Sequence, residues 1–227
     1  MSALISLGGK CKYTNEIAEL VGSTSPVIAA DRGYVHCRSL GIIPDFLVGD
    51  MDSIPGELLI QAKADAATTI KYFDKDKDQT DSEIAADIAV AEGCSEILFI
   101  GAFGERYDHM LGNQMMAASL AARGIQCVLT DGDTYMYTLT PENSPYLIEY
   151  SLFKTDRKII SVIPIGGDIN EVDISGLKYP LSRMPVPLGS QRAVSNELMP
   201  NYRPGNDKAL ISVSNGVAMI IMSKEDL

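Results

Sequence analysis

The chain has 227 residues, which is enough for one large domain or two modest ones, each with its own core. Its formal net charge of −11 at pH 7 argues against nucleic acid as a partner, because neutralising phosphates requires a surplus of lysine and arginine. Four scattered cysteines, no signal peptide and no apolar stretch of about 20 residues together predict a reduced, cytoplasmic protein that does not enter a membrane.

Strand and helix signals alternate through the first part of the chain. Short apolar runs typical of strands are separated by helical or turn-rich segments, and they cover residues 3–7, 27–30, 46–48, 69–72, 97–100 and 126–129. This alternation predicts a mainly parallel sheet with helices on both faces. In such sheets ligands bind beyond the carboxyl ends of the strands, so the residues that follow each strand are candidates for a site.

The run at 46–48 leads into the first candidate. Gly49 follows it, and then come Asp50 and Asp52 with one residue between them. Two carboxylates at a strand end are costly unless a cation lies between them, and the usual cation is Mg²⁺ with a polyphosphate substrate. The alternative is an ordinary acidic turn.

A second acidic segment covers residues 74–83. Thr80 followed three residues later by Glu83 is typical of a capping box, so a helix is predicted to begin here. Asp81 then lies in the first turn, where the helix dipole favours a carboxylate. That structural explanation covers Asp81 but not the aspartates before the helix, such as Asp78.

The third candidate is the glycine-bearing segment 101–109, between a predicted strand and a predicted helix. Such a loop can present backbone N–H groups and the guanidinium of Arg106 to a phosphate. The pattern matches neither the dinucleotide-binding fingerprint nor the P-loop. Alternatively, Asp108 caps the helix and Arg106 is a surface residue.

After about residue 134 the pattern changes to short strand-like runs punctuated by proline, glycine and asparagine. These runs cover residues 135–140, 146–150, 158–163, 169–174, 192–195, 209–214 and 217–222. Asn215 and Gly216 between two apolar runs predict a β-hairpin. The second part is therefore predicted to be a small antiparallel sandwich.

In order and spacing, these segments resemble the motifs of the thiamin pyrophosphokinase family. The matching stretches are Ala30-Asp31-Arg32-Gly33, Ile43 through Ile54, Asp78-Gln79-Thr80-Asp81, Gly101 through Asp108, Gly176 through Leu181 and Val194 through Glu197. The resemblance thus covers nearly the whole chain. Two departures stand out: Arg32 occupies a position where the family most often has glycine, and the chain has no tryptophan to stack on thiamin, a role that Tyr202 could take.

The resemblance implies a Rossmann-like α/β nucleotide-binding catalytic domain over 1–134 and a thiamin-binding β-sandwich over 135–227. It implies transfer of pyrophosphate from ATP to the hydroxyl of thiamin with Mg²⁺, giving thiamin diphosphate and AMP. It also implies a homodimer whose active site lies between the α/β domain of one subunit and the β domain of the other.

The same resemblance assigns the site residues. The catalytic carboxylates are Asp50, Asp52, Asp78 and Asp81. Those that hold Mg²⁺ are Asp50, Asp52 and Asp81. Nucleotide contacts fall to Asp31, Gly33, Arg106, Asp108 and Asn113, and thiamin contacts to Ser195 and Asn196. Either Asp50 or Asp78 could accept the proton of the thiamin hydroxyl.

Two other functions remain open at this stage. A metal-dependent phosphohydrolase could use Asp50 and Asp52 as an Asp-x-Asp motif, although such enzymes place that motif on their first strand and at least two strand signals precede it here. A non-catalytic ligand-binding or metal-binding protein could use the acidic loops simply as cation sites.

Overall fold

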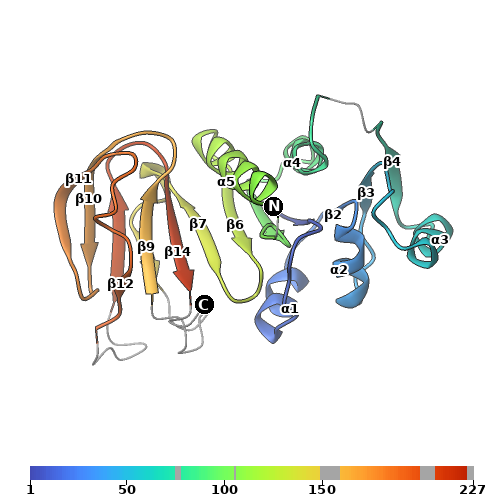
Figure 1. The fold of residues 1–227 in the computed structure, drawn as a ribbon, viewed down its shortest axis with the longest axis horizontal. Helices are drawn as coiled ribbons and strands as arrows, with labels where there is room; N and C mark the ends of the chain where they lie inside the picture. The colour runs from blue at the N-terminus through green and yellow to red at the C-terminus, as the bar shows by residue number, and fades with distance from the viewer. Residues whose placement is uncertain (75–77, 105, 149–158, 200–207, 224–227) are drawn as a thin grey trace. The chain divides into compact units, whose positions relative to one another are not determined.

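The computed structural model describes residues 1–74, 78–104, 106–148, 159–199 and 208–223. The chain divides into two compact units. The first contains residues 1–114 and 128–132, and the second contains residues 115–127 and 133–227. The fold is mixed α/β, with parallel strands in the first unit and antiparallel strands in the second (Figure 1). The predicted boundary at 134/135 stays a prediction.

The strands of the first unit are β1 (Ser2–Ser6), β2 (Val27–Ala30), β3 (Phe46–Gly49), β4 (Thr69–Tyr72), β5 (Glu96–Ile100) and β6 (Gln126–Thr130), of which residues 128–130 belong to this unit. Their order is β6-β5-β1-β2-β3-β4. The pairs from β5 to β4 are all parallel, which confirms the parallel sheet predicted from the sequence.

The helices are α1 (Asn15–Gly22), α2 (Gly33–Ser39), α3 (Gly56–Ala64), α4 (Asp81–Ala91) and α5 (Tyr107–Ala122), which begins in the first unit and ends in the second. Both α2 and α4 contact β1 and β2, from opposite sides of the strands (Figure 1). The predicted capping box is confirmed: the Thr80 hydroxyl accepts from the Glu83 N–H at 3.3 Å, and the Glu83 carboxylate accepts from the Thr80 N–H at 2.8 Å.

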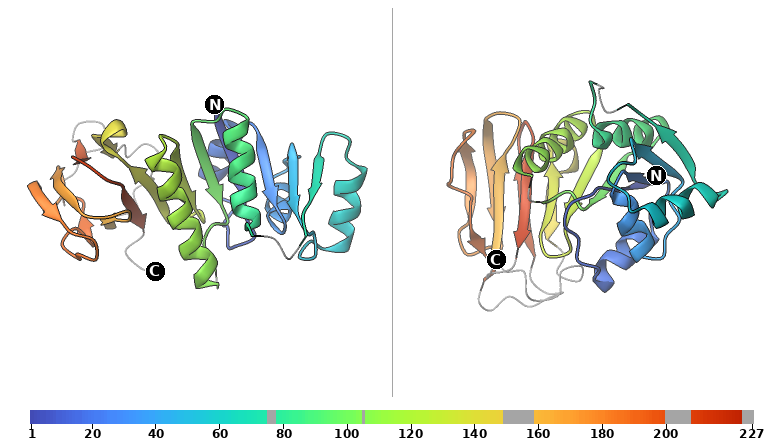
Figure 2. Two further views of the ribbon diagram at one scale, coloured as in Figure 1. Left: turned by 90° about the horizontal axis from the view of Figure 1, so that it is seen from above. Right: turned by 45° about the vertical axis from the view of Figure 1, so that its right-hand side comes forward.

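The core of the first unit lies in its central strands, which run side by side in Figure 2. Every residue of β2 is buried, and so are four of the five residues of β1. Since helices cover both faces of these strands, their sequences are continuous apolar runs rather than alternating ones. Strand β4, at the edge, is mostly exposed. The central strand ends are therefore held rigidly, and side chains that follow them are placed by a buried scaffold.

The second unit contains antiparallel strands in two sheets. One has the order β12-β9-β14-β7, with β7 (Tyr135–Leu139), β9 (Ile159–Pro164), β12 (Asn196–Glu197) and β14 (Ala218–Ser223). The other has the order β11-β10-β13-β8, with β8 (Tyr146–Ile148), β10 (Ile169–Ser175), β11 (Leu181–Val186) and β13 (Ala209–Val213). A short 3₁₀ helix, Pro141–Asn143, links β7 to β8.

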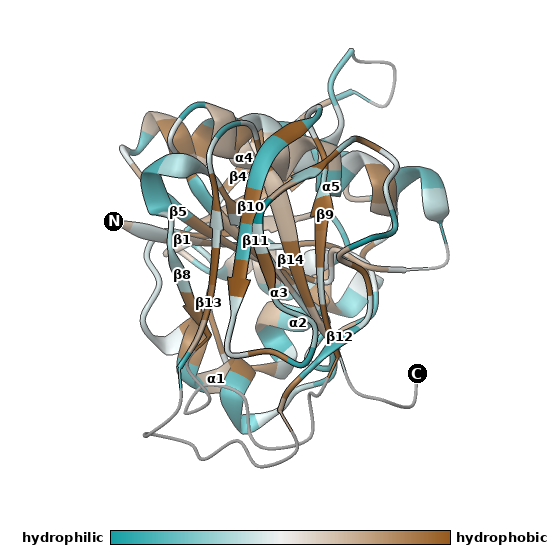
Figure 3. Ribbon diagram, turned by 90° about the vertical axis from the view of Figure 1, so that its left-hand side faces the viewer, coloured by the Kyte–Doolittle hydropathy of each residue, from teal (hydrophilic) through white to brown (hydrophobic). Residues whose placement is uncertain are grey.

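Burial alternates along β10 and β13, as expected when one face of a sheet is covered. In β10, Ile169, Val172 and Ile174 are buried while Asn170 and Ser175 are exposed. Hydrophobic and hydrophilic residues accordingly follow one another along β10 in Figure 3. The alternation along β10 therefore reflects burial of one face of its sheet.

Three sequence predictions for the second unit were wrong. Asn215 and Gly216 do not form a hairpin, because β13 pairs with β10 and β8 whereas β14 pairs with β7 and β9. The chain does bend at residues 214–216, with Gly216 at φ 71°, but the strands on either side of the bend pair in different sheets. Residues 192–195 are turns rather than a strand, which begins at Asn196. Strand β11 was missed because it contains Pro185, which an edge strand tolerates.

The cysteines are free thiols, and Cys37, Cys94 and Cys127 are buried. Burial raises the pKa of Cys37 and of Cys127 to about 12, so these thiols stay protonated near neutral pH. Within the described ranges, each helix is too short or too polar to cross a bilayer.

Candidate functional site

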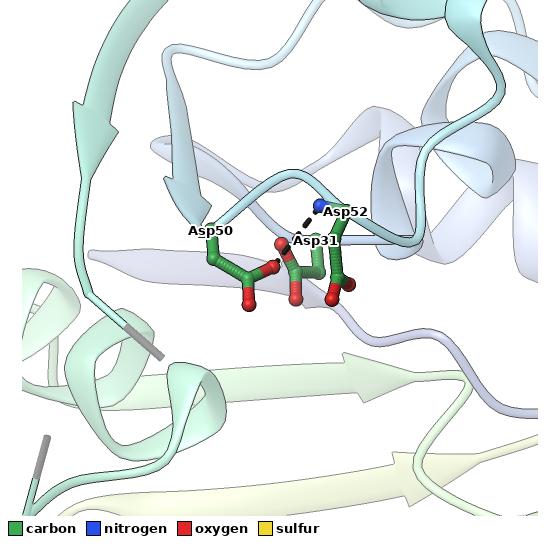
Figure 4. Close-up of side chains that lie close together, drawn as sticks. All are labelled: Asp31, Asp50 and Asp52. Atoms are coloured by element: carbon green, nitrogen blue, oxygen red, sulfur yellow. Dashed lines mark hydrogen bonds between the residues drawn. The ribbon is translucent and has the colours of Figure 1, made fainter. Parts of the chain in front are cut away.

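Three aspartates gather at the carboxyl ends of β2 and β3 (Figure 4). Asp31 directly follows β2, Asp50 directly follows β3, and Asp52 comes two residues after Asp50. Each offers a carboxylate oxygen, and these three oxygens lie within 4.8 Å of one another. The Asp50/Asp52 pair was singled out from the sequence as metal-binding. Asp31, expected only to position a nucleotide, is the third member of this carboxylate cluster.

Backbone geometry brings the three carboxylates together. Asp31 and Met51 adopt positive φ angles of 46° and 66°, a conformation rare for residues other than glycine. Asp31 Oδ1 accepts a hydrogen bond from the Met51 N–H at 3.0 Å, and Asp50 Oδ1 accepts one from the Asp52 N–H at 3.0 Å. Such conformations persist where the surrounding structure imposes them, and they concentrate at functional sites.

Glycine is required beside the cluster. Gly49 has a φ of 136°, and a Cβ added there would lie 2.1 Å from Asp31 Oδ1. A Cβ added to Gly33 would lie 1.8 Å from the carbonyl oxygen of Ser6, so glycine lets α2 begin directly against the end of β1. Gly33, predicted as a nucleotide contact, thus has a structural role of its own.

The pKa of Asp31 is raised to about 7, mainly because the carboxyl group is partly buried. The Met51 N–H opposes this rise, and the neighbouring carboxylates of Asp81 and Asp50 add to it. Near neutral pH the cluster therefore favours binding either a proton or a cation. Clustered carboxylate oxygens are the donors that hard divalent cations such as Mg²⁺ take, so the residues present fit a Mg²⁺ site.

The two aspartates of the second acidic segment differ in position. Asp81 is the first residue of α4, is half-buried, and is close enough to Asp31 to raise its pKa. Asp78 is exposed, and it is not among the described residues whose carboxylates form the cluster. Asp81 thus lies near the cluster, and the metal-binding role of Asp81 and the role of Asp78 both stay predictions.

The loop between β5 and α5 holds the predicted phosphate-binding residues. Arg106 Nη2 and Asp108 Oδ2 form an exposed ion pair at 2.6 Å, and this pairing holds the pKa of Asp108 at about 2. Asp108 lies inside the first turn of α5 rather than before it, so it is not the N-cap. The buried amide of Asn113 donates to the carbonyl of Ala102 at 3.2 Å and so fixes the start of this loop.

Sequence reasoning missed the loop that follows β1. The Gly9 N–H donates to the Gly101 carbonyl at 2.9 Å, and the Gly9 carbonyl is 2.8 Å from His36 Nε2. His36 Nδ1 lies 2.7 Å from the Tyr13 hydroxyl. His36 therefore ties α2 to the loop after β1, which in turn is bonded to the loop after β5. The adjacent glycines Gly8 and Gly9 were the only signal for this loop in the sequence.

The second unit holds Ser195 and Asn196, the predicted thiamin contacts. Asn196 is buried; its Oδ1 accepts from the Tyr179 N–H at 3.0 Å and the Glu197 N–H at 2.9 Å, and its Nδ2 donates to the Tyr179 carbonyl at 2.7 Å. Ser195 is exposed, with a φ of 57°, and its N–H donates to the Ser161 hydroxyl at 3.0 Å. The amide of Asn196 thus fixes the neighbouring segment, whereas Ser195 presents its side chain to solvent. Tyr202 lies outside the described residues.

Comparison with known proteins gives a consistent result. Residues 17–129 match the model of the thiamin pyrophosphokinase catalytic domain, and residues 147–218 match the model of the thiamin pyrophosphokinase vitamin B1 binding domain. The thiamine pyrophosphokinase of Bacillus subtilis (strain 168) is 32% identical over 215 residues, which are 93% of this chain and 94% of that protein.

Solved structures agree over the full length. The crystal structure of thiamine pyrophosphokinase from Bacillus subtilis has a TM-score of 0.85 and 29% identity, covering 99% of this chain and 100% of that one. The crystal structure of thiamin pyrophosphokinase from Geobacillus thermodenitrificans has a TM-score of 0.80 and 27% identity, covering 100% of this chain and 99% of that one.

Proposed function

Because the chain belongs to the thiamin pyrophosphokinase family, whose members make thiamin diphosphate from thiamin, we propose that it transfers pyrophosphate from ATP to the thiamin hydroxyl and releases AMP. The observation that carries this proposal is the carboxylate cluster at the ends of two adjacent parallel strands. Three acidic side chains lie close together and the pKa of Asp31 is raised, so the cluster favours binding a cation. A polyphosphate is the substrate that such a cation most often accompanies.

The metal in this proposal is Mg²⁺, held by Asp50, Asp52 and Asp81, with Asp31 beside them. Bound there, Mg²⁺ supplies positive charge that neutralises the phosphates and favours displacement at phosphorus. The protein supplies position: Gly49 and the strained turn at Met51 hold the carboxylates in place before any ligand arrives. Preorganisation of this kind lowers the activation barrier of the transfer, because the protein does not have to rearrange during the reaction.

Nucleotide binding is assigned to the neighbouring strand ends. Arg106 and Asp108 lie on the loop after β5, where the guanidinium can exchange its carboxylate partner for a phosphate. Asn113 and Gly33 support this edge of the sheet, one through the Ala102 carbonyl and the other through close backbone approach. Asp50 or Asp78 accepts the proton of the attacking hydroxyl.

Thiamin binding is assigned to the second unit. Ser195 contacts thiamin through its exposed hydroxyl, and Asn196 contributes through the segment that it holds at Tyr179. We propose a homodimer in which these residues complete the active site of the partner subunit, and a cytoplasmic enzyme. The Rossmann-like description of the α/β domain and the sandwich description of the β domain belong to the same proposal.

AMP formation from ATP and Mg²⁺, measured with and without thiamin, tests the reaction. We expect AMP only with thiamin, in equal amounts with thiamin diphosphate. Release of inorganic phosphate without an acceptor would instead identify a phosphohydrolase. Binding of Mg²⁺ and ATP by the folded protein with no turnover would identify a non-catalytic binding protein.

A further inference from the structure

Arg32 lies beside the carboxylate cluster without pairing to it. It directly follows Asp31 and precedes the first residue of α2, and its side chain is exposed. None of the other described residues accepts a hydrogen bond from its guanidinium or forms an ion pair with it, and its side chain makes no capping bond to α2. An arginine next to three carboxylates ordinarily pairs with one of them, so its separation from them requires a reason.

The direction of the Arg32 side chain explains this separation. A Cβ added to Gly8 would lie 3.0 Å from the Arg32 Cβ and 3.8 Å from its Cγ, so the base of the side chain runs over the loop after β1. His36, which binds the carbonyl of Gly9, has its pKa lowered by burial and, to a smaller extent, by the charge of Arg32. The charges that raise the pKa of Asp31 are those of Asp81 and Asp50. The base of the Arg32 side chain therefore lies over the glycine loop, and its guanidinium does not pair with the aspartates of the cluster.

The neighbouring arginines differ from Arg32. Arg106, on the loop after β5, is already neutralised by Asp108 at 2.6 Å. Arg38 lies in the last turn of α2, at the other end of the helix, where its charge affects Tyr34. Arg32 thus combines a guanidinium without a described partner with a position one residue from the cluster.

We propose that Arg32 binds the phosphates of the nucleotide that are transferred to the acceptor, beside the cation held by the aspartates; this rests on the proposed function. A guanidinium donates two parallel hydrogen bonds to a phosphate, which a lysine cannot reproduce. Keeping the cation ligands and the arginine apart lets one edge of the sheet hold both a metal and the anion that the metal accompanies. Arg32 is therefore a substrate-binding residue that distinguishes a triphosphate from a monophosphate.

Equilibrium binding to the full-length protein tests this proposal. The probes are α,β-methylene-ATP, which cannot be cleaved at the reacting bond, and AMP, each with Mg²⁺ and without thiamin. Replacing Arg32 by Ala should weaken binding of α,β-methylene-ATP by roughly ten- to a hundredfold, the worth of a hydrogen bond to a charged group. AMP should bind the Ala variant and the unmodified protein equally well. The affinity of Arg32→Lys for α,β-methylene-ATP should lie between those of Arg32→Ala and the unmodified protein.

Arg38→Ala is the matched control, since it removes the same charge from the far end of α2 and should leave the binding of both nucleotides unchanged. Circular dichroism of each variant establishes that it is folded. Equal losses for AMP and for the triphosphate, or no loss for either, would overturn the role assigned to Arg32. If the unmodified protein binds neither nucleotide, the proposed function fails, and the proposal for Arg32 fails with it.

Discussion

Polar side chains are used differently in the two units of this protein. At the ends of β2 and β3 in the first unit, three carboxylates crowd together and burial raises the pKa of Asp31 to about 7. In the second unit the buried amide of Asn196 makes three hydrogen bonds to backbone groups of Tyr179 and Glu197. The first group brings like charges together, while the second bonds to the backbone of its own unit.

This difference separates residues kept for chemistry from residues kept for structure. A carboxylate cluster costs free energy in the folded protein, and a ligand that relieves the repulsion repays that cost on binding. A buried amide that bonds to backbone groups stabilises the fold directly. Substitutions in the first group should therefore change turnover, and substitutions in the second should change stability.

Replacing Asp52 by Asn is the most severe test of this comparison. The substitution removes one charge from the cluster while preserving the size of the side chain, so turnover should fall by roughly a hundredfold or more. The free energy of unfolding without Mg²⁺ should stay the same or rise, because a repulsive charge is lost. AMP production with saturating thiamin and urea denaturation measure the two quantities.

Asp87→Asn is the matched control for this prediction. Asp87 is an exposed aspartate of α4 that accepts a hydrogen bond from Gln79 at 2.9 Å and lies outside the carboxylate cluster. Its replacement should leave turnover unchanged. Near-normal turnover in Asp52→Asn would show that the cluster does not hold the catalytic metal.

Asn196→Ala tests the opposite side of the comparison. It removes the partner of the Tyr179 N–H and carbonyl and leaves a small cavity at a side chain that is only 4% exposed. The free energy of unfolding should fall by about 1–3 kcal/mol, as when a buried polar group loses its partner. The midpoint of urea denaturation, at unchanged slope, measures this loss.

Ser195→Ala provides the comparison within the same segment. Ser195 is exposed and contributes its backbone N–H, rather than its hydroxyl, to the hydrogen bond with Ser161. The free energy of unfolding of the variant should therefore stay within about 0.5 kcal/mol of that of the unmodified protein, while the KM for thiamin rises. A larger loss of stability in Ser195→Ala than in Asn196→Ala would reverse the roles assigned to these two residues.

The features that the sequence could predict are those that depend on residues close together in the chain. The buried strands of the first unit are continuous apolar runs, and the Thr80–Glu83 capping box is a local signal, so both were found. Asp50 and Asp52 are close in sequence, but Asp31 joins them only because β2 and β3 pair in parallel. Whether the strands on either side of Asn215 pair with each other depends on the distant strands that compete for them, and no local pattern encodes that outcome. The bond between His36 and Gly9 spans 27 residues and is equally invisible in the sequence.

His36→Gln should have the smallest effect, and its signature is pH dependence. The Gly9 carbonyl can only accept, so His36 Nε2 carries the hydrogen and Nδ1 of the neutral ring accepts from the Tyr13 hydroxyl. Burial lowers the pKa of His36, and the charge of Arg32 lowers it to a smaller extent. The hydrogen bond to the Gly9 carbonyl acts in the opposite direction, because it favours the charged ring. Because the unfolded chain then binds more protons than the folded one below a pH of about 6.5, the stability that His36 provides is present above that pH and is lost as the pH falls through the folded pKa.

Near pH 7.5 the variant should be about 1 kcal/mol less stable than the unmodified protein, and the difference should shrink towards pH 5. Urea denaturation at several pH values measures it, and parallel stability curves for the two proteins would mean that His36 does not hold the loop as the neutral ring.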